Sequence, residues 1–293
     1  MQELLQQIWN GMAIGSVYAL VSVGYTLVFG VLKFINFAHG SVLTIGAYVA
    51  LFMTLAKVVP FPAAFSLSLL LSGLSATQIE QRAYRPLRER GAPRLNLLIT
   101  SIGVSLLVEN SIVVFLSADF HVFPSVIPVQ PLSLGLIRIP PVDLFLVGAA
   151  VFLMTTLSYF VNHTLTGLCI KAVALDRETA ALMGINVNRA IACTFFIAGL
   201  MASAAGVLIG LKFNVNPYLG GLFGVKSFAA AVVGGIGSVP GSYLGGYLIG
   251  LLETLGAGYV SSNFKDAIAF VLLVLVLLFR PSGILGKGIQ EKV

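Results

Sequence analysis

Long apolar runs separated by short polar segments dominate the pattern along this chain. One of them, from Ala267 to Phe279, contains no polar side-chain atom. Because about 20 apolar residues cross the hydrocarbon core of a bilayer, such runs predict membrane-spanning helices. We expect spans near residues 8–32, 34–56, 61–79, 95–117, 142–161, 190–211, 226–237, 239–258 and 264–280.

The composition supports a surface that faces lipid. Hydrophobic residues make up 58% of the chain and charged residues 10%, whereas soluble domains carry about 25% charged residues. Only helix bundles and closed barrels span bilayers. Barrel strands alternate in polarity at every second residue, and the runs here do not. The sequence therefore predicts an all-α integral membrane protein, a polytopic bundle of about nine transmembrane helices.

The polar segments between the runs are too short to form a core of their own. Residues 1–293 are therefore expected to form a single transmembrane domain without room for a nucleotide-binding or catalytic domain. Two of the predicted helices, near 34–56 and 226–237, contain glycines that predict interruptions. Paired interrupted segments in the two halves of a transporter point to a site between the halves.

Charge in the connecting segments predicts the orientation. Residues 80–94 contain five arginines and two glutamates, so the positive-inside rule assigns them to the cytoplasm. Residues 118–141 contain five prolines and one arginine, which suits an extended segment or small hairpin on the outer side. By alternation, residues 162–189 and the C-terminal tail are cytoplasmic. Residues 212–225 and the short N-terminus are outside.

Polar residues within apolar spans are the first candidates for a substrate path. Asn36, His39 and Gly40 place an amide, an imidazole and a glycine inside the second span. Polar groups at that depth are costly and usually face protein or a water-filled cavity. They could provide partners for the charged groups of a zwitterion. Alternatively, Asn36 and His39 cap and pin the start of the helix.

Small residues form the second candidate. Gly237, Gly241 and Gly245 recur every four residues, and Ser238, Ser242, Gly246 and Gly250 form an adjacent row. Such a smooth helix face permits close approach of another backbone. Together with Gly235, the face either lines the substrate path or serves tight packing alone.

A short cytoplasmic helix is expected within residues 172–189. Asp176 is a suitable N-cap, and Glu178 would then occupy the favourable first turn. Gly184 is a plausible helix stop, after which Ile185 starts the connection to the next span. Such a helix could bind a socket on a soluble partner, or it could be an ordinary interfacial helix.

Several chemistries find no support in the sequence. There is no phosphate-binding loop and no His-Glu-x-x-His motif, and three histidines lie far apart. No catalytic residue, metal site or cofactor is therefore predicted. The net charge of +6 comes from basic residues that cluster in the loops. This is the distribution expected of residues that set membrane topology, and it does not suggest a nucleic-acid partner.

Glu109 and Glu253 lie alone within their spans. They are either proton or ion sites or interhelical hydrogen-bond partners.

Three patches resemble one family of transporters. They are GSVYAL, GYTLVFG and INFAHG in residues 15–40, RETAALMGI at 177–185 and VGGIGSVPG at 233–241. In these patches the chain is similar to the permeases of LIV-type ABC importers, which carry branched-chain amino acids across the bacterial inner membrane. Ser41 stands where that family often has an acidic residue, which weakens a fine substrate assignment.

The resemblance implies partners. They are a second related permease, two cytoplasmic ATPase subunits and an extracytoplasmic amino-acid-binding protein that docks on the outer loops. It also implies that Arg177, Glu178, Ala181, Gly184 and Ile185 couple the permease to the ATPases. Three alternatives remain: the same machine carrying urea or short amides, a standalone secondary carrier, and an intramembrane enzyme.

Overall fold

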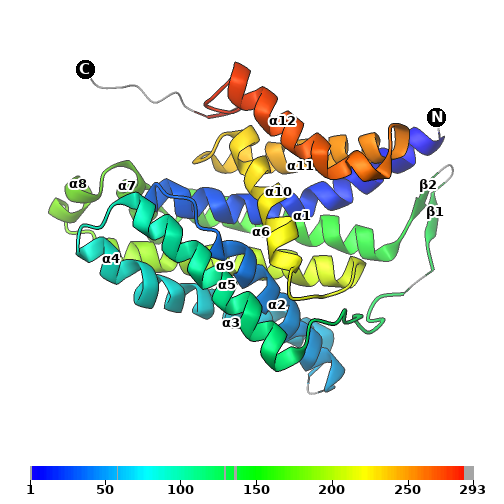
Figure 1. The fold of residues 1–293 in the computed structure, drawn as a ribbon, viewed down its shortest axis with the longest axis horizontal. Helices are drawn as coiled ribbons and strands as arrows, with labels where there is room; N and C mark the ends of the chain where they lie inside the picture. The colour runs from blue at the N-terminus through cyan, green and yellow to red at the C-terminus, as the bar shows by residue number, and fades with distance from the viewer. Residues whose placement is uncertain (1, 58, 129, 135–136, 287–293) are drawn as a thin grey trace.

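The computed structural model describes residues 2–286, apart from residues 58, 129, 135 and 136, and helices dominate it (Figure 1). The long helices are α1 (Gln2–Leu32), α2 (Ala38–Leu55), α3 (Phe61–Ile79), α5 (Arg94–Leu116), α6 (Pro141–His163), α9 (Val187–Lys212), α10 (Leu219–Gly234), α11 (Val239–Tyr259) and α12 (Lys265–Phe279). The shorter elements are α4 (Arg85–Glu89), α7 (Leu165–Leu175), α8 (Arg177–Leu182), a π-helical turn at Glu80–Tyr84, a 3₁₀ turn at Ser262–Phe264, and strands β1 (Leu132–Leu134) and β2 (Ile137–Ile139).

Among the described residues, seven helices are long and apolar enough to cross a membrane. They include α1, α2, α5, α6 and α9, α3 with its extension to Glu89, and α12 with the turn before it. This confirms an all-α, multi-pass membrane protein. It does not confirm the expected count of about nine spans, because α10, at 16 residues, and the glycine-rich α11 are not among the seven.

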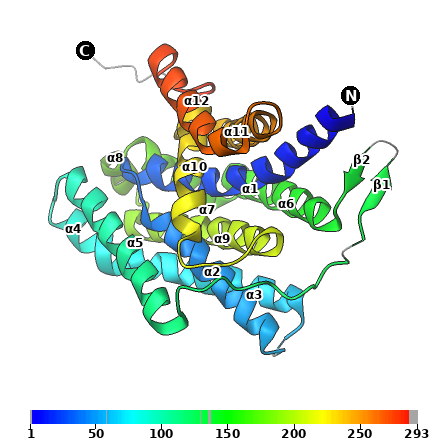
Figure 2. The ribbon, with the colours of Figure 1, turned by 45° about the vertical axis from the view of Figure 1, so that its right-hand side comes forward.

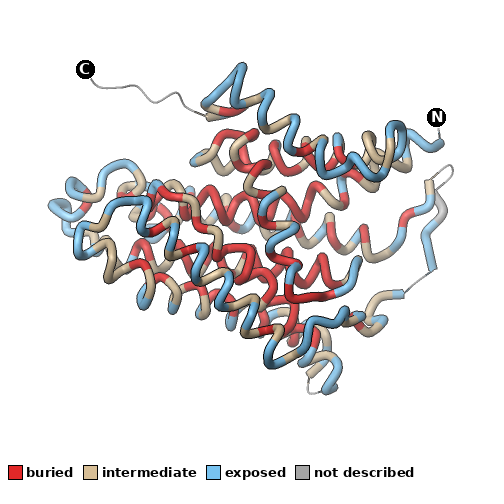
Figure 3. The backbone as a smooth tube through the Cα atoms, viewed as in Figure 1, coloured by how far each residue is buried: buried red, intermediate tan, exposed pale blue. Residues whose placement is uncertain are grey.

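Helix α1 lies at the centre of the bundle and packs against α9, α10 and α11. Of its most apolar 18-residue window, 83% is buried, compared with 17% for α5. Buried backbone follows α1 and α9 through the middle of the molecule, while α5 and α12 lie at the periphery (Figure 3).

Helix α10 runs across the direction of α1 and α6 in both views (Figures 1 and 2). It begins against α2, where the Gly220 backbone N–H donates to Thr44 Oγ1 at 2.9 Å. It ends against α11, where a Cβ built on Gly234 would lie 2.0 Å from the carbonyl oxygen of Gly241. The helix that was expected at 226–237 therefore starts seven residues earlier and ends three residues sooner.

The interruptions expected inside two spans lie between helices instead. Helix α2 is continuous through Gly40, and the break precedes it at residues 33–37, where Lys33 has a φ of 57°. The second break separates α10 from α11, with Gly235 at φ 107° and Gly237 at φ 96°. A glycine inside a helix costs only about 1 kcal/mol, so the close packing of Gly40 on α10 outweighs its low helix propensity.

The connecting segments gather at the two ends as predicted. His121 and Val215 exchange backbone hydrogen bonds of 2.8 Å, which join the segments after α5 and α9. β1 and β2 form an antiparallel hairpin at this end, where the backbone N–H of Arg138 donates to Gln6 Oε1. The arginine-rich segment after α3 lies at the opposite end with Asn188, and by the positive-inside rule that end is cytoplasmic.

Candidate functional site

Asn36, His39 and Gly40 lie at or just before the start of α2, and all three are buried. Asn36 Oδ1 accepts a 2.7 Å hydrogen bond from the hydroxyl of Tyr84. The ring of His39 lies 4.7 Å from that of Tyr25, edge to face. Its Nε2 has no hydrogen-bond partner among the described residues. Gly40 is in backbone contact with α10, because a Cβ on it would lie 2.3 Å from the carbonyl oxygen of Gly220.

Gly235, Gly237 and Gly241 lie at the turn between α10 and α11. A Cβ on Gly241 would lie 2.4 Å from the carbonyl oxygen of Gly234. In the adjacent row, a Cβ on Gly246 would lie 2.4 Å from the backbone of Ala19 on α1. The smooth face of α11 therefore packs against α10 and α1, as the packing interpretation expects.

The two sets of candidate path residues are not brought together. One lies at the start of α10 and the other at its end, so a helix of 16 residues separates them, about 24 Å at 1.5 Å per residue. Gly40 contacts the start of α10 at Gly220, and Gly241 contacts its end at Gly234. The role of the two sets in a substrate path stays a prediction.

The expected cytoplasmic helix is present as α8. Asp176 Oδ1 accepts hydrogen bonds from the backbone N–H groups of Glu178, at 2.9 Å, and Thr179, at 3.0 Å. This is the N-cap geometry that stabilises helix starts. Gly184 follows the helix at φ 83°, a conformation that glycine adopts without strain. The preceding helix α7 was not expected, because its apolar residues had been assigned to a connecting loop.

The outward surface of this region is apolar. Ala181 and Gly184 are exposed, and Ile185 is partly buried against the core. Three large side chains are almost fully exposed: Leu175 at 88%, Leu182 at 88% and Met183 at 78%. Exposed apolar side chains that gather in one place are typical of protein–protein or membrane interaction sites.

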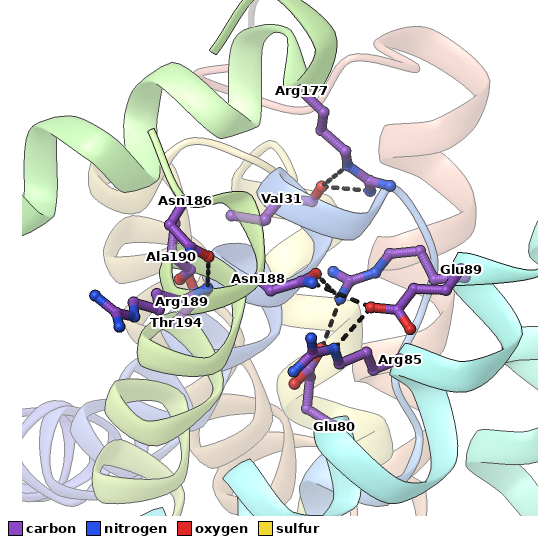
Figure 4. Close-up of polar contacts among 11 residues, drawn as sticks. Val31, Glu80, Arg85, Glu89, Arg177, Asn186, Asn188, Arg189, Ala190 and Thr194 are labelled. Atoms are coloured by element: carbon purple, nitrogen blue, oxygen red, sulfur yellow. Dashed lines mark hydrogen bonds and ion pairs between the residues drawn. The ribbon is translucent and has the colours of Figure 1, made fainter. Parts of the chain in front are cut away.

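Hydrogen bonds tie α8 to the rest of the cytoplasmic end. The guanidinium of Arg177 donates through Nε and Nη2 to the carbonyl oxygen of Val31, in the last turn of α1 (Figure 4). Asn188, at the start of α9, accepts from Arg88 Nη2 at 2.7 Å and donates to Glu89 Oε1 at 3.1 Å. Movement of α8 is therefore linked directly to α1.

A basic pocket of about 510 Å³ adjoins α8, and four cations, Lys33, Arg88, Arg94 and Arg177, line it together with two carboxylates, Asp176 and Glu178. Partial burial lowers the pKa of Lys33, and the nearby Arg177 and Arg94 lower it further. Burial likewise lowers the pKa of Arg177, together with repulsion from Arg88 and Arg94. The cations of the lining therefore outnumber its carboxylates by two.

Sequence reasoning missed an ion cluster in the outer half of the bundle. Lys226 Nζ lies 2.7 Å from Glu253 Oε1 and 2.6 Å from Asp266 Oδ1. The Tyr18 hydroxyl donates to Glu253 Oε2 at 2.8 Å. The signal was a lone lysine in an apolar run, but Lys226 was not among the predicted candidates because the helix was expected to start at that residue. Glu253 thus has interhelical partners, which was the second interpretation given for it.

Comparison with known proteins decides the family. Residues 7–277 match the family described as the branched-chain amino acid transport system / permease component. This chain belongs to that family. It is 41% identical to the permease protein BraD of the high-affinity branched-chain amino acid transport system of Pseudomonas aeruginosa, over 99% of this chain and 98% of BraD. It is 39% identical to the corresponding permease protein LivH of Escherichia coli K12, over 99% and 97% of the two chains.

A solved structure shares the fold of this family member. The complex of PsaBC from Streptococcus pneumoniae with a Fab contains a chain that superposes with a TM-score of 0.52 at 15% identity, covering 95% of this chain and 92% of that one. The likeness extends to the fold alone. Family membership makes the chain a transport permease component and not an enzyme, in agreement with its multi-pass architecture.

Proposed function

We propose that this chain is the membrane-spanning permease subunit of an ABC importer that carries branched-chain amino acids across the bacterial inner membrane. The observation that carries the proposal is the similarity to BraD and LivH along almost the entire chain. A match of this extent includes the outer loops, the bundle and the cytoplasmic helix, so the chain's role in the machine is expected to be the same.

In this proposal, ATP hydrolysis occurs in two partner ATPase subunits that dock at the cytoplasmic end. The exposed tips of Leu182 and Met183 on and beside α8 supply an apolar contact. The basic pocket next to them supplies attraction for acidic side chains. Arg177, Glu178, Ala181, Gly184 and Ile185 form the coupling surface, and the hydrogen bonds from Arg177 to Val31 connect it to the bundle.

The other partners follow from the same architecture. A second, related permease completes the pore, and an extracytoplasmic amino-acid-binding protein delivers substrate to the outer end. The hairpin of β1 and β2 and the segment bonded through His121 and Val215 lie at that end. If the binding protein binds one conformation of the permease more tightly than another, its binding shifts the conformational equilibrium toward that state.

The test has two parts. The tagged chain is isolated from native membranes, and the proteins that accompany it are identified by mass spectrometry. In parallel, cells that contain or lack the chain are assayed for uptake of labelled leucine, isoleucine and valine, with urea and acetamide as competitors. We expect two ATPases and a second permease in the isolate, with uptake that stops when ATP is depleted.

Other results would overturn the proposal in distinct ways. Uptake by the purified chain alone, driven by an ion gradient, would make it a secondary carrier. Competition by urea or acetamide, without competition among the three amino acids, would keep the machine and change its cargo. If cells that lack the chain, and contain no second copy of it, take up the three amino acids at an unchanged rate, the assignment of branched-chain amino acids as substrates is refuted.

A further inference from the structure

A cavity of about 630 Å³ opens at the outer end of the bundle, between α1, α10 and α11. Phe120, Phe213 and Asn216, from the outer connecting segments, form its mouth. Lys226 and Glu253 line it, together with Tyr18. Cavities that hold small ligands measure roughly 300–1,000 Å³, so the volume suits an amino acid.

The charged wall lies in the outer half of the bundle, where Asp266 stands in the first turn of α12. The side chains of Lys226 and Glu253 are nevertheless only 12% and 7% exposed. Ionisable groups buried inside a membrane protein are rare and usually mark a substrate or ion pathway. Hydrogen bonds between neutral side chains would be enough to hold the helices together, so packing alone does not require these charges.

Charged groups of both signs line the cavity: Lys212, Lys226, Lys265 and Glu253. Two of the lysines are paired, Lys212 with Asp143 at 2.6 Å and Lys226 with Glu253 and Asp266. A site that presents a cation and a carboxylate side by side can bind both ends of a zwitterion.

One of the two partners of Lys226 is easily replaced. Asp266, at the start of α12, is 54% exposed, whereas Glu253 is held by Tyr18 as well. An exposed ion pair contributes little stability. Leu222 and Phe223, one turn before Lys226, line the same cavity and offer apolar contact to an aliphatic side chain.

We propose that this cavity is the substrate vestibule of the permease, in which the α-carboxylate of a branched-chain amino acid takes the place of Asp266 on Lys226 while its ammonium group binds Glu253 and Tyr18. The inference rests on the function proposed above and adds the site and the mode of recognition. No covalent bond changes, and Asp266 is already 54% exposed before it is released.

The experiment measures protection of an engineered thiol in the assembled complex. Leu222, 59% exposed in the cavity, is replaced by cysteine in a chain whose Cys169 and Cys193 are serine. The control is Val122→Cys, 70% exposed in an outer segment and absent from the lining. The complex is reconstituted in lipid nanodiscs without the binding protein, and the rate of reaction with a membrane-impermeant maleimide is followed.

We expect millimolar L-leucine to slow modification of the thiol at 222 several-fold, without effect at 122. Its keto acid, which lacks the ammonium group, and isoamylamine, which lacks the carboxylate, should have little effect. Equal rates with and without leucine, or equal protection by all three compounds, would overturn the proposal. So would failure of the reagent to reach position 222.

Variants of the charged groups separate recognition from packing. Glu253→Gln and Lys226→Gln should abolish protection by leucine, whereas Asp266→Asn, which frees Lys226, should give protection at lower leucine concentrations. If Asp266→Asn instead weakens protection, the proposal that the substrate carboxylate displaces Asp266 from Lys226 is wrong. Leucine uptake by wild-type cells is measured alongside. Normal uptake without protection refutes the vestibule alone, and absent uptake refutes the proposed function.

Discussion

The contact between α1 and α11 makes the sharpest prediction about stability. A Cβ added to Gly250 would lie 2.4 Å from the Cα of Gly15 and 2.7 Å from the carbonyl oxygen of Gly11. Carbon atoms in favourable contact are about 3.5–4.0 Å apart. Gly250→Ala must therefore push α1 and α11 apart by roughly 1 Å. A separation of that size removes about a quarter to a half of the dispersion energy of each atomic contact between the two helices.

The expected loss follows from two opposing effects. Overpacking of a well-packed interior costs about 1–3 kcal/mol. Replacing a helical glycine by alanine recovers about 0.5–1 kcal/mol, since alanine loses less backbone entropy. The net destabilisation should be about 1–2 kcal/mol. Gly246→Ala should act in the same direction, because its Cβ would lie 2.4 Å from the backbone of Ala19.

Gly148 provides a matched control. It is an exposed helical glycine on α6, and a Cβ added to it would have no atom of the described residues within 4 Å. Gly148→Ala should therefore stabilise the protein by about 0.5–1 kcal/mol. The unfolding free energy is measured by titration with dodecyl sulfate in mixed micelles, followed by circular dichroism. If Gly250→Ala is as stable as Gly148→Ala, the close approach of α1 and α11 is refuted.

Three further changes test other contacts. Leu182→Asp should lower the amount of ATPase that co-purifies with the chain several-fold, because it places a charge on an apolar docking surface, whereas Val122→Asp at the outer end should not. Tyr84→Phe and Asn36→Ala should each cost about 1–3 kcal/mol by leaving one buried group unpaired. The double variant should cost less than their sum in the same titration. Asp176→Ala should destabilise the start of α8 by about 1 kcal/mol, which faster amide exchange at the first turn would report, and Asp176→Asn should retain the cap.

Local patterns were sufficient for much of the fold. Apolar runs located most of the long helices, because a bilayer requires long apolar segments whatever they contact. The cap at Asp176 and the stop at Gly184 were predictable, since a cap depends on residues within one turn. The charge of residues 80–94 and the prolines of 118–141 placed their segments at opposite ends.

Features that depend on distant contacts were not predictable. The start of α10 at Leu219 depends on Thr44, which is far away in the sequence and binds the Gly220 N–H. The hydropathy pattern contains no information about this bond, so the helix was placed too late and Lys226 was not recognised as a candidate. The grouping of Lys226 with Glu253 and Asp266 likewise joins three helices whose order in space no local pattern specifies.

A continuous set of contacts connects the cytoplasmic helix to the outer cavity. Arg177 holds the carbonyl oxygen of Val31 at the end of α1. The chain then turns directly into α2, and Thr44 on that helix binds the start of α10. Six residues further along α10 lies Lys226. Because α1 is locked to α11 by glycine contacts along its length, a displacement of α8 would be taken up by the turn at 33–37 and by α10. Coupling between distant sites can be carried by a contiguous network of packed helices and hydrogen bonds, and α10 is the helix at the outer end of this one.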